Sequence, residues 1–177
     1  SAAYNGQNGP GIGLLLEAGI AFATINYRLL EEVDDEGVAK PLGDSRRCLQ
    51  FMRYHAESLN LDKAAIAAVG SSAGAGSSLW LGTHDDMADP RSPDPVLRES
   101  SRVRAVGIVE TQATYDLLRW ETKIFASYGF TLELAVQLGL EQRLLSFYGI
   151  DSIDQIEGDP AIVAYRADVD MLGLMDA

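Results

Sequence analysis

Short apolar runs alternate with segments of helical apolar spacing along the first two-thirds of the chain. The runs that predict buried β-strands are residues 20–29, 64–69 and 103–109. The segments that predict helices are residues 14–18, 44–59 and 73–82. Strands that alternate with helices in this way indicate an α/β fold, with a parallel sheet flanked by helices.

The connections between these elements are polar. Residues 31–43 are charged and contain glycine and proline, which predicts a surface loop. Asp44 or Ser45 is suited to cap the helix that follows. Residues 83–102 are polar and proline-containing as well, so we expect a second loop there.

The last third of the chain has a different pattern, dominated by helices. One helix is expected at residues 141–148 with Gly149 closing it, and Asp159-Pro160 should begin another. No further strand pattern follows. We therefore divide the chain into residues 1–114, a partial α/β core, and residues 115–177, a helical cap or insertion region.

A G-x-S-x-G motif lies between the second expected strand and its following helix, from Gly70 to Gly74. A nucleophile elbow requires this context, because a sharp turn from strand to helix raises the serine hydroxyl above the sheet edge. Small residues two positions before and after the serine let strand and helix approach closely. The motif predicts Ser72 as a nucleophile. It also predicts the backbone N–H of Ala73, at the helix N-terminus, as an oxyanion donor.

The same glycines do not fit the phosphate-binding patterns. For a dinucleotide-binding G-x-G-x-x-G that starts at Gly74, Leu79 occupies the place of the last glycine. For a P-loop that starts at Gly70, Ala75 replaces the second glycine and no lysine follows. A glycine- and serine-rich turn that only packs or binds an anion is the alternative to a nucleophile here.

Two segments resemble the hormone-sensitive-lipase-like and carboxylesterase branch of the α/β-hydrolases: residues 25–29 (INYRL) and 69–74 (VGSSAG). That branch typically shows a Y-R-L-x-P-E strand end and a G-D-S-A-G-G elbow. Here Ser71 replaces the aspartate and Ala75 the second glycine of the pair. The resemblance implies a carboxylic ester hydrolase with a small-molecule ester substrate, a Ser–acid–His triad and an H-G-G-G oxyanion loop.

Parts of that family's catalytic site are not evident in this chain. No H-G-G-G precedes the first expected strand, and the family places its histidine after the serine. After Ser72 the sequence has only His84, which we expect to be a solvated loop residue, roughly 15 Å or more from the serine. His55 should be partly buried on its helix. We therefore expect an incomplete chain that lacks the oxyanion loop, the triad acid and the histidine, and that is inactive alone.

Acidic residues after the motif are poor matches to the triad acid. Glu110 follows the third expected strand, where some α/β-hydrolases carry the acid, and Asp116 is better suited to cap a helix or hold a loop. The aspartates at positions 85, 86, 89 and 94 match no calcium-binding spacing and indicate a solvated acidic loop. We expect no metal and no cofactor.

The composition narrows the choice of partners. A net charge of −12 with 47% hydrophobic residues indicates a soluble globular chain and disfavours nucleic acid and anionic membranes. No stretch is long and apolar enough to span a bilayer. The single cysteine, Cys48, excludes an internal disulfide and fits a cytoplasmic location better than a secreted one.

Two alternatives to an esterase stay open. One is a non-catalytic hydrolase-like module that binds a partner or ligand, and the other is an amidase or peptidase with the same acyl-transfer chemistry. The aromatic residues of the helical region could line an acyl pocket or pack in the core; they are Trp120, Phe125, Tyr128, Phe130, Phe147 and Tyr148.

Overall fold

The computed structural model describes residues 10–176. Within this range two strands pair, β1 (Ala67–Ser71) and β2 (Ala105–Val109), and they form a parallel sheet. Ala67 lies opposite Ala105 and Ser71 lies opposite Val109. The carboxyl ends of both strands therefore lie at the same edge of the sheet.

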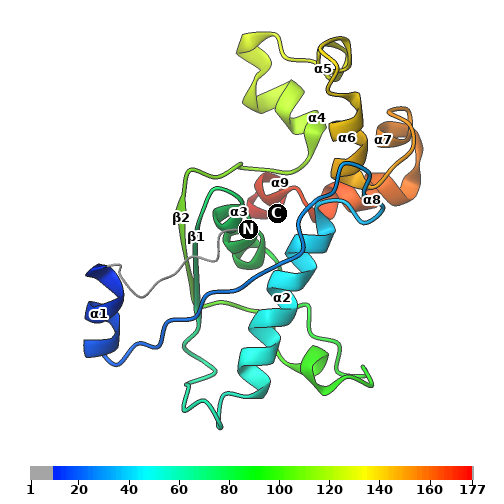
Figure 1. The fold of residues 1–177 in the computed structure, drawn as a ribbon. Coiled ribbons are helices and arrows are strands. Elements are labelled where there is room, and N and C mark those ends of the chain that lie inside the picture. The colour runs from blue at the N-terminus through cyan, green and yellow to red at the C-terminus, as the bar shows by residue number, and fades with distance from the viewer. Residues whose placement is uncertain (1–9, 177) are drawn as a thin grey trace.

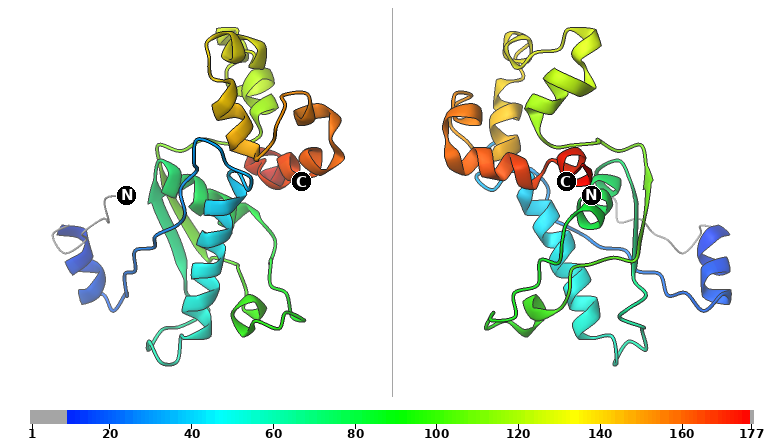
Figure 2. Two further views of the ribbon diagram at one scale, coloured as in Figure 1. Left: turned by 45° about the vertical axis from the view of Figure 1, so that its right-hand side comes forward. Right: turned by 180° about the vertical axis from the view of Figure 1, so that it is seen from behind.

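Helices make up most of the remaining secondary structure (Figure 1). Up to β2 they are α1 (Pro10–Glu17), α2 (Ala39–Tyr54), α3 (Ala73–Thr83) and the 3-10 turn η2 (Pro95–Arg98). After β2 they are α4 (Leu117–Arg119), η3 (Trp120–Ile124), η4 (Ala126–Tyr128), α5 (Leu132–Gln137), α6 (Glu141–Tyr148), α7 (Gln155–Gly158), α8 (Pro160–Asp168) and α9 (Met171–Met175). α3 packs against both strands, and α2 and α9 pack against α3. Figure 2 shows α4–α7 gathered at one end of the molecule, with α1 lying apart from them.

The hydrophobic core is centred on α3. Leu79, Trp80 and Leu81 are buried in it. The same cluster includes Tyr148 and Met171, which are 2% and 0% exposed. Helices that follow β2 thus bury their apolar side chains against the helix that follows β1.

Side-chain hydroxyls allow a helix as rich in serine as α3 to be buried. The hydroxyls of Ser77 and Ser78 donate to the carbonyl oxygens of Ala73 and Gly74, at 3.2 and 2.9 Å. These bonds to the carbonyl four residues earlier satisfy polar groups that would otherwise destabilise a buried helix.

The predicted helix ends in the last third are confirmed. Gly149 follows α6 in the left-handed conformation, with φ of 67°, and a Cβ there would lie 2.4 Å from the carbonyl oxygen of Asp35. The Asp159 carboxylate accepts the amide of Ala161 at 2.8 Å, and Pro160 is the first residue of α8.

The strand expected at residues 20–29 is wrong, since this segment has no regular secondary structure. A strand needs a neighbour for its backbone groups, and within residues 10–176 β1 and β2 pair only with each other. The amide of Arg28 instead donates to the Asp44 carboxylate at 2.8 Å, and its guanidinium lies 2.9 Å from the same group. An apolar pattern is therefore not sufficient here to form a strand.

The helix expected at residues 44–59 is shifted toward the N-terminus, so the expected loop at residues 31–43 ends before Ala39. Pro41 falls in the first turn of α2, where backbone amides have no partner within the helix, and it does not interrupt it. The predicted cap at Asp44 or Ser45 is accordingly wrong. Ser45 lies inside the helix, where its hydroxyl donates to the Pro41 carbonyl at 2.8 Å.

Candidate active site

Ser72 occupies the turn between β1 and α3, as the motif predicted for a nucleophile. Its φ of 53° and ψ of −123° belong to a region that residues with a side chain rarely adopt. The Ser72 amide donates to the carbonyl oxygen of Val109 at 3.0 Å, and its own carbonyl accepts the amide of Gly76 at 3.0 Å. The sheet and the first turn of the helix therefore hold this backbone conformation together.

The two glycines of the motif have different roles in the turn. A Cβ on Gly70 would lie 2.3 Å from the backbone carbon of Gly74 and 2.6 Å from the nitrogen of Ala75. A Cβ on Gly74 would meet nothing within 4 Å. The expectation that both positions must be small is therefore confirmed for Gly70 and wrong for Gly74, because Gly70 faces the helix backbone closely and the Gly74 Cβ position is open.

The side chain of Ser72 and the neighbouring residue Ala73 are exposed at the same edge. Ala73 is the first residue of α3, so its backbone N–H has no partner within the helix. The aligned peptide dipoles of α3 also place partial positive charge at this end. A hydroxyl beside a free amide and a positive helix terminus is an arrangement that can attack a carbonyl carbon and stabilise the resulting oxyanion.

Glu110 lies next to this turn at the end of β2. It directly follows Val109, the residue opposite Ser71, and its φ is 54°. Its side chain is exposed. The fold thus brings Glu110 to the same sheet edge as Ser72, and the expectation that it is a poor match to the triad acid stays a prediction.

The expectation that His84 is a solvated loop residue is wrong. His84 is 7% exposed, with Nδ1 at 2.7 Å from the Trp80 carbonyl oxygen and Nε2 at 3.2 Å from Oδ1 of Asp168. It follows the last residue of α3, and the length of that helix separates it from Ser72. The spacing of four residues between Trp80 and His84 was the signal for its burial, because such residues share one helix face.

His55 is partly buried, as expected. It follows α2 as the C-cap residue, and its ring centroid lies 4.3 Å from that of Phe51. Its contacts are with α2, whereas those of His84 are with α3 and α8. Both histidines are therefore engaged away from the turn that holds Ser72.

The acidic residues after the motif have structural partners. Asp116 caps α4 by accepting the amide of Leu118 at 3.0 Å, which confirms the predicted cap, and it also binds Arg166 at 2.8 Å. In the expected acidic loop, Asp94 pairs with Arg47 at 2.6 Å. Among residues 10–176, no three or more His, Cys, Asp or Glu side chains are grouped so that they could hold a metal ion.

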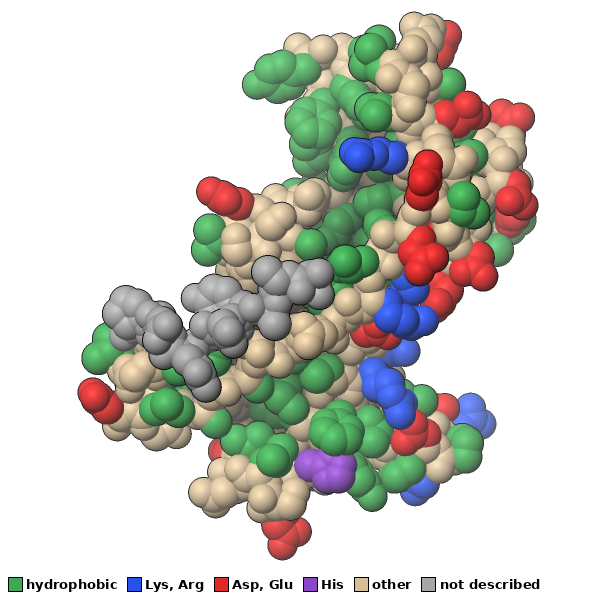
Figure 3. Space-filling view, in the orientation of Figure 1, with side chains coloured by type: hydrophobic (Ala, Val, Ile, Leu, Met, Phe, Trp, Pro, Cys, Tyr) green, Lys and Arg blue, Asp and Glu red, His purple; other side chains and the backbone are tan. Residues whose placement is uncertain are grey.

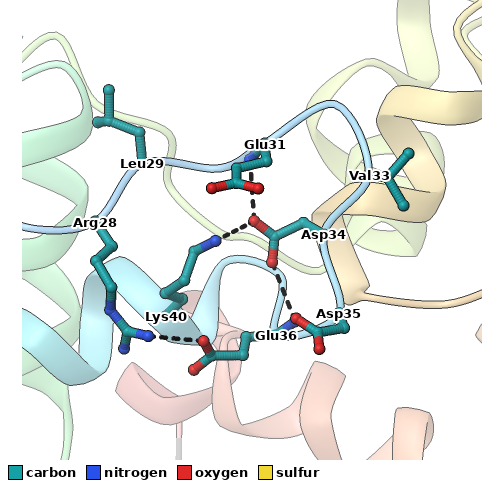
Figure 4. A pocket seen from close by; sticks show the side chains of 8 residues that line it. All are labelled: Arg28, Leu29, Glu31, Val33, Asp34, Asp35, Glu36 and Lys40. Atoms are coloured by element: carbon teal, nitrogen blue, oxygen red, sulfur yellow. Dashed lines mark hydrogen bonds and ion pairs between the residues drawn. The ribbon is translucent and has the colours of Figure 1, made fainter.

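A hollow of about 410 Å³ lies where the segment before α2 folds back on the helix, and Ser72 is not among the residues that line it (Figure 4). Four of its charged residues are paired within the lining: Lys40 binds Asp34, and Arg28 binds Glu36 at 2.7 Å. Burial raises the pKa of Asp34, but the Lys40 ammonium and three backbone amides outweigh it and hold that pKa well below its usual range. These contacts fix the loop before α2.

The surface carries both apolar and acidic areas (Figure 3). Apolar side chains are exposed among the helices after β2, including Tyr128 at 83% and Leu138 at 69%. Along residues 10–176, every helix is too short or too polar to cross a membrane.

Comparisons with known proteins indicate both a family and a fold for this chain. A family model, BD-FAE, matches residues 3–140. The crystal structure of an acetyl ester-xyloside bifunctional hydrolase from Caldicellulosiruptor lactoaceticus is similar over 92% of this chain, with a TM-score of 0.59 and 24% identity. The match covers 49% of that protein, so the chain spans about half of its length. No match was found among curated proteins. The two-stranded parallel sheet with its helices is therefore a partial α/β-hydrolase fold.

Proposed function

Because the chain belongs to the BD-FAE family of α/β-hydrolase-type esterases, we propose that it is a serine hydrolase of carboxylic esters, with Ser72 as its nucleophile. The observation that carries this proposal is the backbone of Ser72, which has a φ of 53° at a turn fixed by both the sheet and α3. Strained residues of this kind are concentrated at functional sites. The exposed hydroxyl of Ser72 supports the same reading.

The proposed reaction is acyl transfer to water in two steps. A general base takes the hydroxyl proton of Ser72 while Oγ bonds to the ester carbonyl carbon, and the alcohol leaves with a proton. Water then attacks the acyl-enzyme and releases the acid. The Ala73 amide and the positive end of α3 stabilise the oxyanion formed in each step.

We propose that neither His84 nor His55 is the general base. His84 is buried against Trp80 and Asp168, and His55 contacts Phe51 on α2. The triad histidine, its acid and the oxyanion loop would then be supplied by residues other than those described. Under this proposal the 177-residue chain alone has little or no turnover.

Residues 115–177 form the proposed cap over a core of residues 1–114. In the cap, the rings of Trp120, Phe125 and Phe147 form a series of contacts with centroid separations of 6.1 and 6.0 Å. Phe125 is 40% exposed and could contact an acyl group. Tyr148 is better explained by core packing, because it is 2% exposed and its hydroxyl accepts the amide of Leu117 at 2.7 Å.

The first test is to sequence the coding DNA on both sides of this segment and to express the complete reading frame. We expect an H-G-G-G upstream, and an aspartate followed by a histidine downstream. p-Nitrophenyl acetate is a suitable first substrate, since the name of the similar structure refers to an acetyl ester.

The matched variants are Ser72→Ala and Ser71→Ala, because both serines are exposed and adjacent. Ser72→Ala should lower the turnover number by about a million-fold, as loss of a serine nucleophile does elsewhere, while Ser71→Ala retains most of it. Turnover that survives in Ser72→Ala would contradict the proposal. A reading frame without a further histidine would support the non-catalytic binding module instead.

A further inference from the structure

His84 joins the end of α3 to the end of α8, 84 residues further along the chain. Its Nε2 lies 3.2 Å from Oδ1 of Asp168, the last residue of α8. One turn earlier on α3, the indole N–H of Trp80 donates to the backbone carbonyl of Asp168 at 3.1 Å. The His84 ring also lies 4.4 Å from the Trp80 ring, between centroids. Two side chains of α3 therefore hold one residue of α8.

Both nitrogens of the His84 ring face hydrogen-bond acceptors. Nδ1 is 2.7 Å from the Trp80 carbonyl oxygen, which can only accept, so Nδ1 must carry a proton. Neutral imidazole has a single N–H, so Nε2 would then present a lone pair to the Asp168 carboxylate. Only the imidazolium, with a proton on each nitrogen, satisfies both contacts.

We propose that His84 and Asp168 form a pH-sensitive clasp between α3 and α8, closed while His84 carries two protons and loosened when it loses one. The clasp acts on the helix that bears Ser72 at its other end. Its second contact, from Trp80 to the Asp168 backbone, does not involve a titratable group, so one of the two contacts to α8 is retained when the side-chain pair opens.

Other charged and titratable groups on the elements around the clasp make contacts that do not involve the His84 ring. Arg102 donates to the His84 carbonyl at 2.7 Å and lies 3.4 Å from Asp85. On α8, the Tyr165 hydroxyl donates to the Glu36 carbonyl at 3.1 Å, and the N-cap of α9, Asp170, pairs with Arg119 at 2.7 Å. On α2, Arg46 reaches the sulfur of Met87, at 4.0 Å. Of these groups and the clasp residues, only His84 ordinarily changes its charge between pH 5 and 8.

The direction of the pH effect follows from the contacts. Burial lowers the pKa of His84, but the Asp168 carboxylate and the Trp80 carbonyl outweigh it and raise that pKa above 6.5. Because the pKa of His84 is higher in the folded state, protonated His84 stabilises the fold. This contribution is complete below the unfolded pKa of 6.5 and is lost as the pH rises through the folded pKa. The clasp should therefore be closed in mildly acidic solution and loosened in alkaline solution.

Amide hydrogen exchange of the 177-residue chain tests the clasp. Exchange at residues 160–168 is measured at about pH 5.5 and about pH 8.5, on either side of the ordinary histidine pKa, and is corrected for its intrinsic pH dependence. We expect a several-fold loss of protection in α8 at the higher pH, with α2 as an internal reference. In Asp168→Asn, which keeps the backbone contact to Trp80, this pH dependence should disappear.

His55→Gln is the control, because it removes the other histidine and should leave the pH dependence intact. The ¹⁵N shifts of the wild-type His84 ring give a direct readout that does not require a variant to fold. Two protonated nitrogens at about pH 6 support the clasp, and a single one overturns it. Unchanged α8 protection in the wild type, or an unaltered pH dependence in Asp168→Asn, also overturns it.

Discussion

The backbone amide of Ser72 donates a hydrogen bond of 3.0 Å to the carbonyl oxygen of Val109. The last paired positions of the sheet are Ser71 and Val109, so this bond extends the contact between the strands to the residue of the turn itself. The left-handed backbone of Ser72 is thereby attached to β2 as well as to β1. Substitutions in either strand can consequently change the backbone conformation of Ser72, the candidate nucleophile.

The close approach of β1 and α3 predicts opposite effects for two glycine substitutions. In Gly70→Ala the new Cβ would lie 2.3 Å from the backbone of Gly74, so strand and helix must separate, at a cost of about 1–3 kcal/mol of unfolding free energy. Gly74→Ala meets nothing within 4 Å and replaces a helical glycine, so it should stabilise the chain by about 0.5–1 kcal/mol. Urea unfolding measures both, and equal stability of the two variants would contradict the assigned contact.

The backbone strain at Ser72 predicts that glycine is the more stable substitute. Glycine adopts a φ of 53° without a steric cost, whereas alanine retains the strain that serine has. The free energy of unfolding of Ser72→Gly should therefore be roughly 0.5–2 kcal/mol higher than that of Ser72→Ala. Asn60, also at a φ of 53°, provides a comparison, because asparagine tolerates that region and Asn60→Gly should gain less. An Ala variant as stable as the Gly variant would show that the turn stores no strain.

Local signals in the sequence were sufficient to place the candidate nucleophile. The close approach of Gly70 to Gly74 and Ala75 involves residues that are near one another in the chain, and the structure has β1 and α3 on either side of Ser72. Caps such as Asp159 also depend on neighbouring residues alone. Elements of this kind can be predicted because the residues that form them are adjacent in the chain.

Features that depend on distant partners were missed. The segment at residues 20–29 has the composition of a strand, but a strand requires a neighbour that the local pattern does not specify. His84 was expected in solvent because its partner, Asp168, lies 84 residues later in the chain. Pairing across such separations is set by packing of the whole fold, which periodicity alone cannot encode.

Substitution of Asp116 should lower the free energy of unfolding by more than the loss of a helix cap alone, because Asp116 also forms an ion pair. Asp116 caps α4 and binds Arg166, whose side chain is 15% exposed, so Asp116→Ala leaves a largely buried guanidinium without its partner. Arg166 keeps its bond to the Ile156 carbonyl at 3.0 Å but loses its only carboxylate partner among the described residues, and we expect a cost of about 3 kcal/mol. Asp159→Ala removes a cap of the same kind from α8 and should cost about 1 kcal/mol. Denaturant midpoints of the two variants measure the difference, and equal losses would show that the Arg166 pair adds nothing.

The buried carboxylate of Asp34 predicts sensitivity to acid. Its side chain is 0% exposed, and it accepts three backbone amides and pairs with Lys40. Because these contacts hold its pKa well below the usual range, its stabilising contribution is complete above the unfolded pKa of 3.8 and is lost as the pH falls toward the folded value. Asp34→Asn should lower the free energy of unfolding at neutral pH by more than about 0.5 kcal/mol, the usual limit for a surface substitution. It should also make stability fall less steeply as the pH is lowered.

The neighbouring Asp35 is exposed and provides the control, because Asp35→Asn should change neither the stability at neutral pH nor its fall in acid. Thermal unfolding between about pH 2 and pH 7 measures this, since the loss begins only below the unfolded carboxylate pKa. An acid limb as steep in Asp34→Asn as in the wild type would assign the acid sensitivity to other carboxylates.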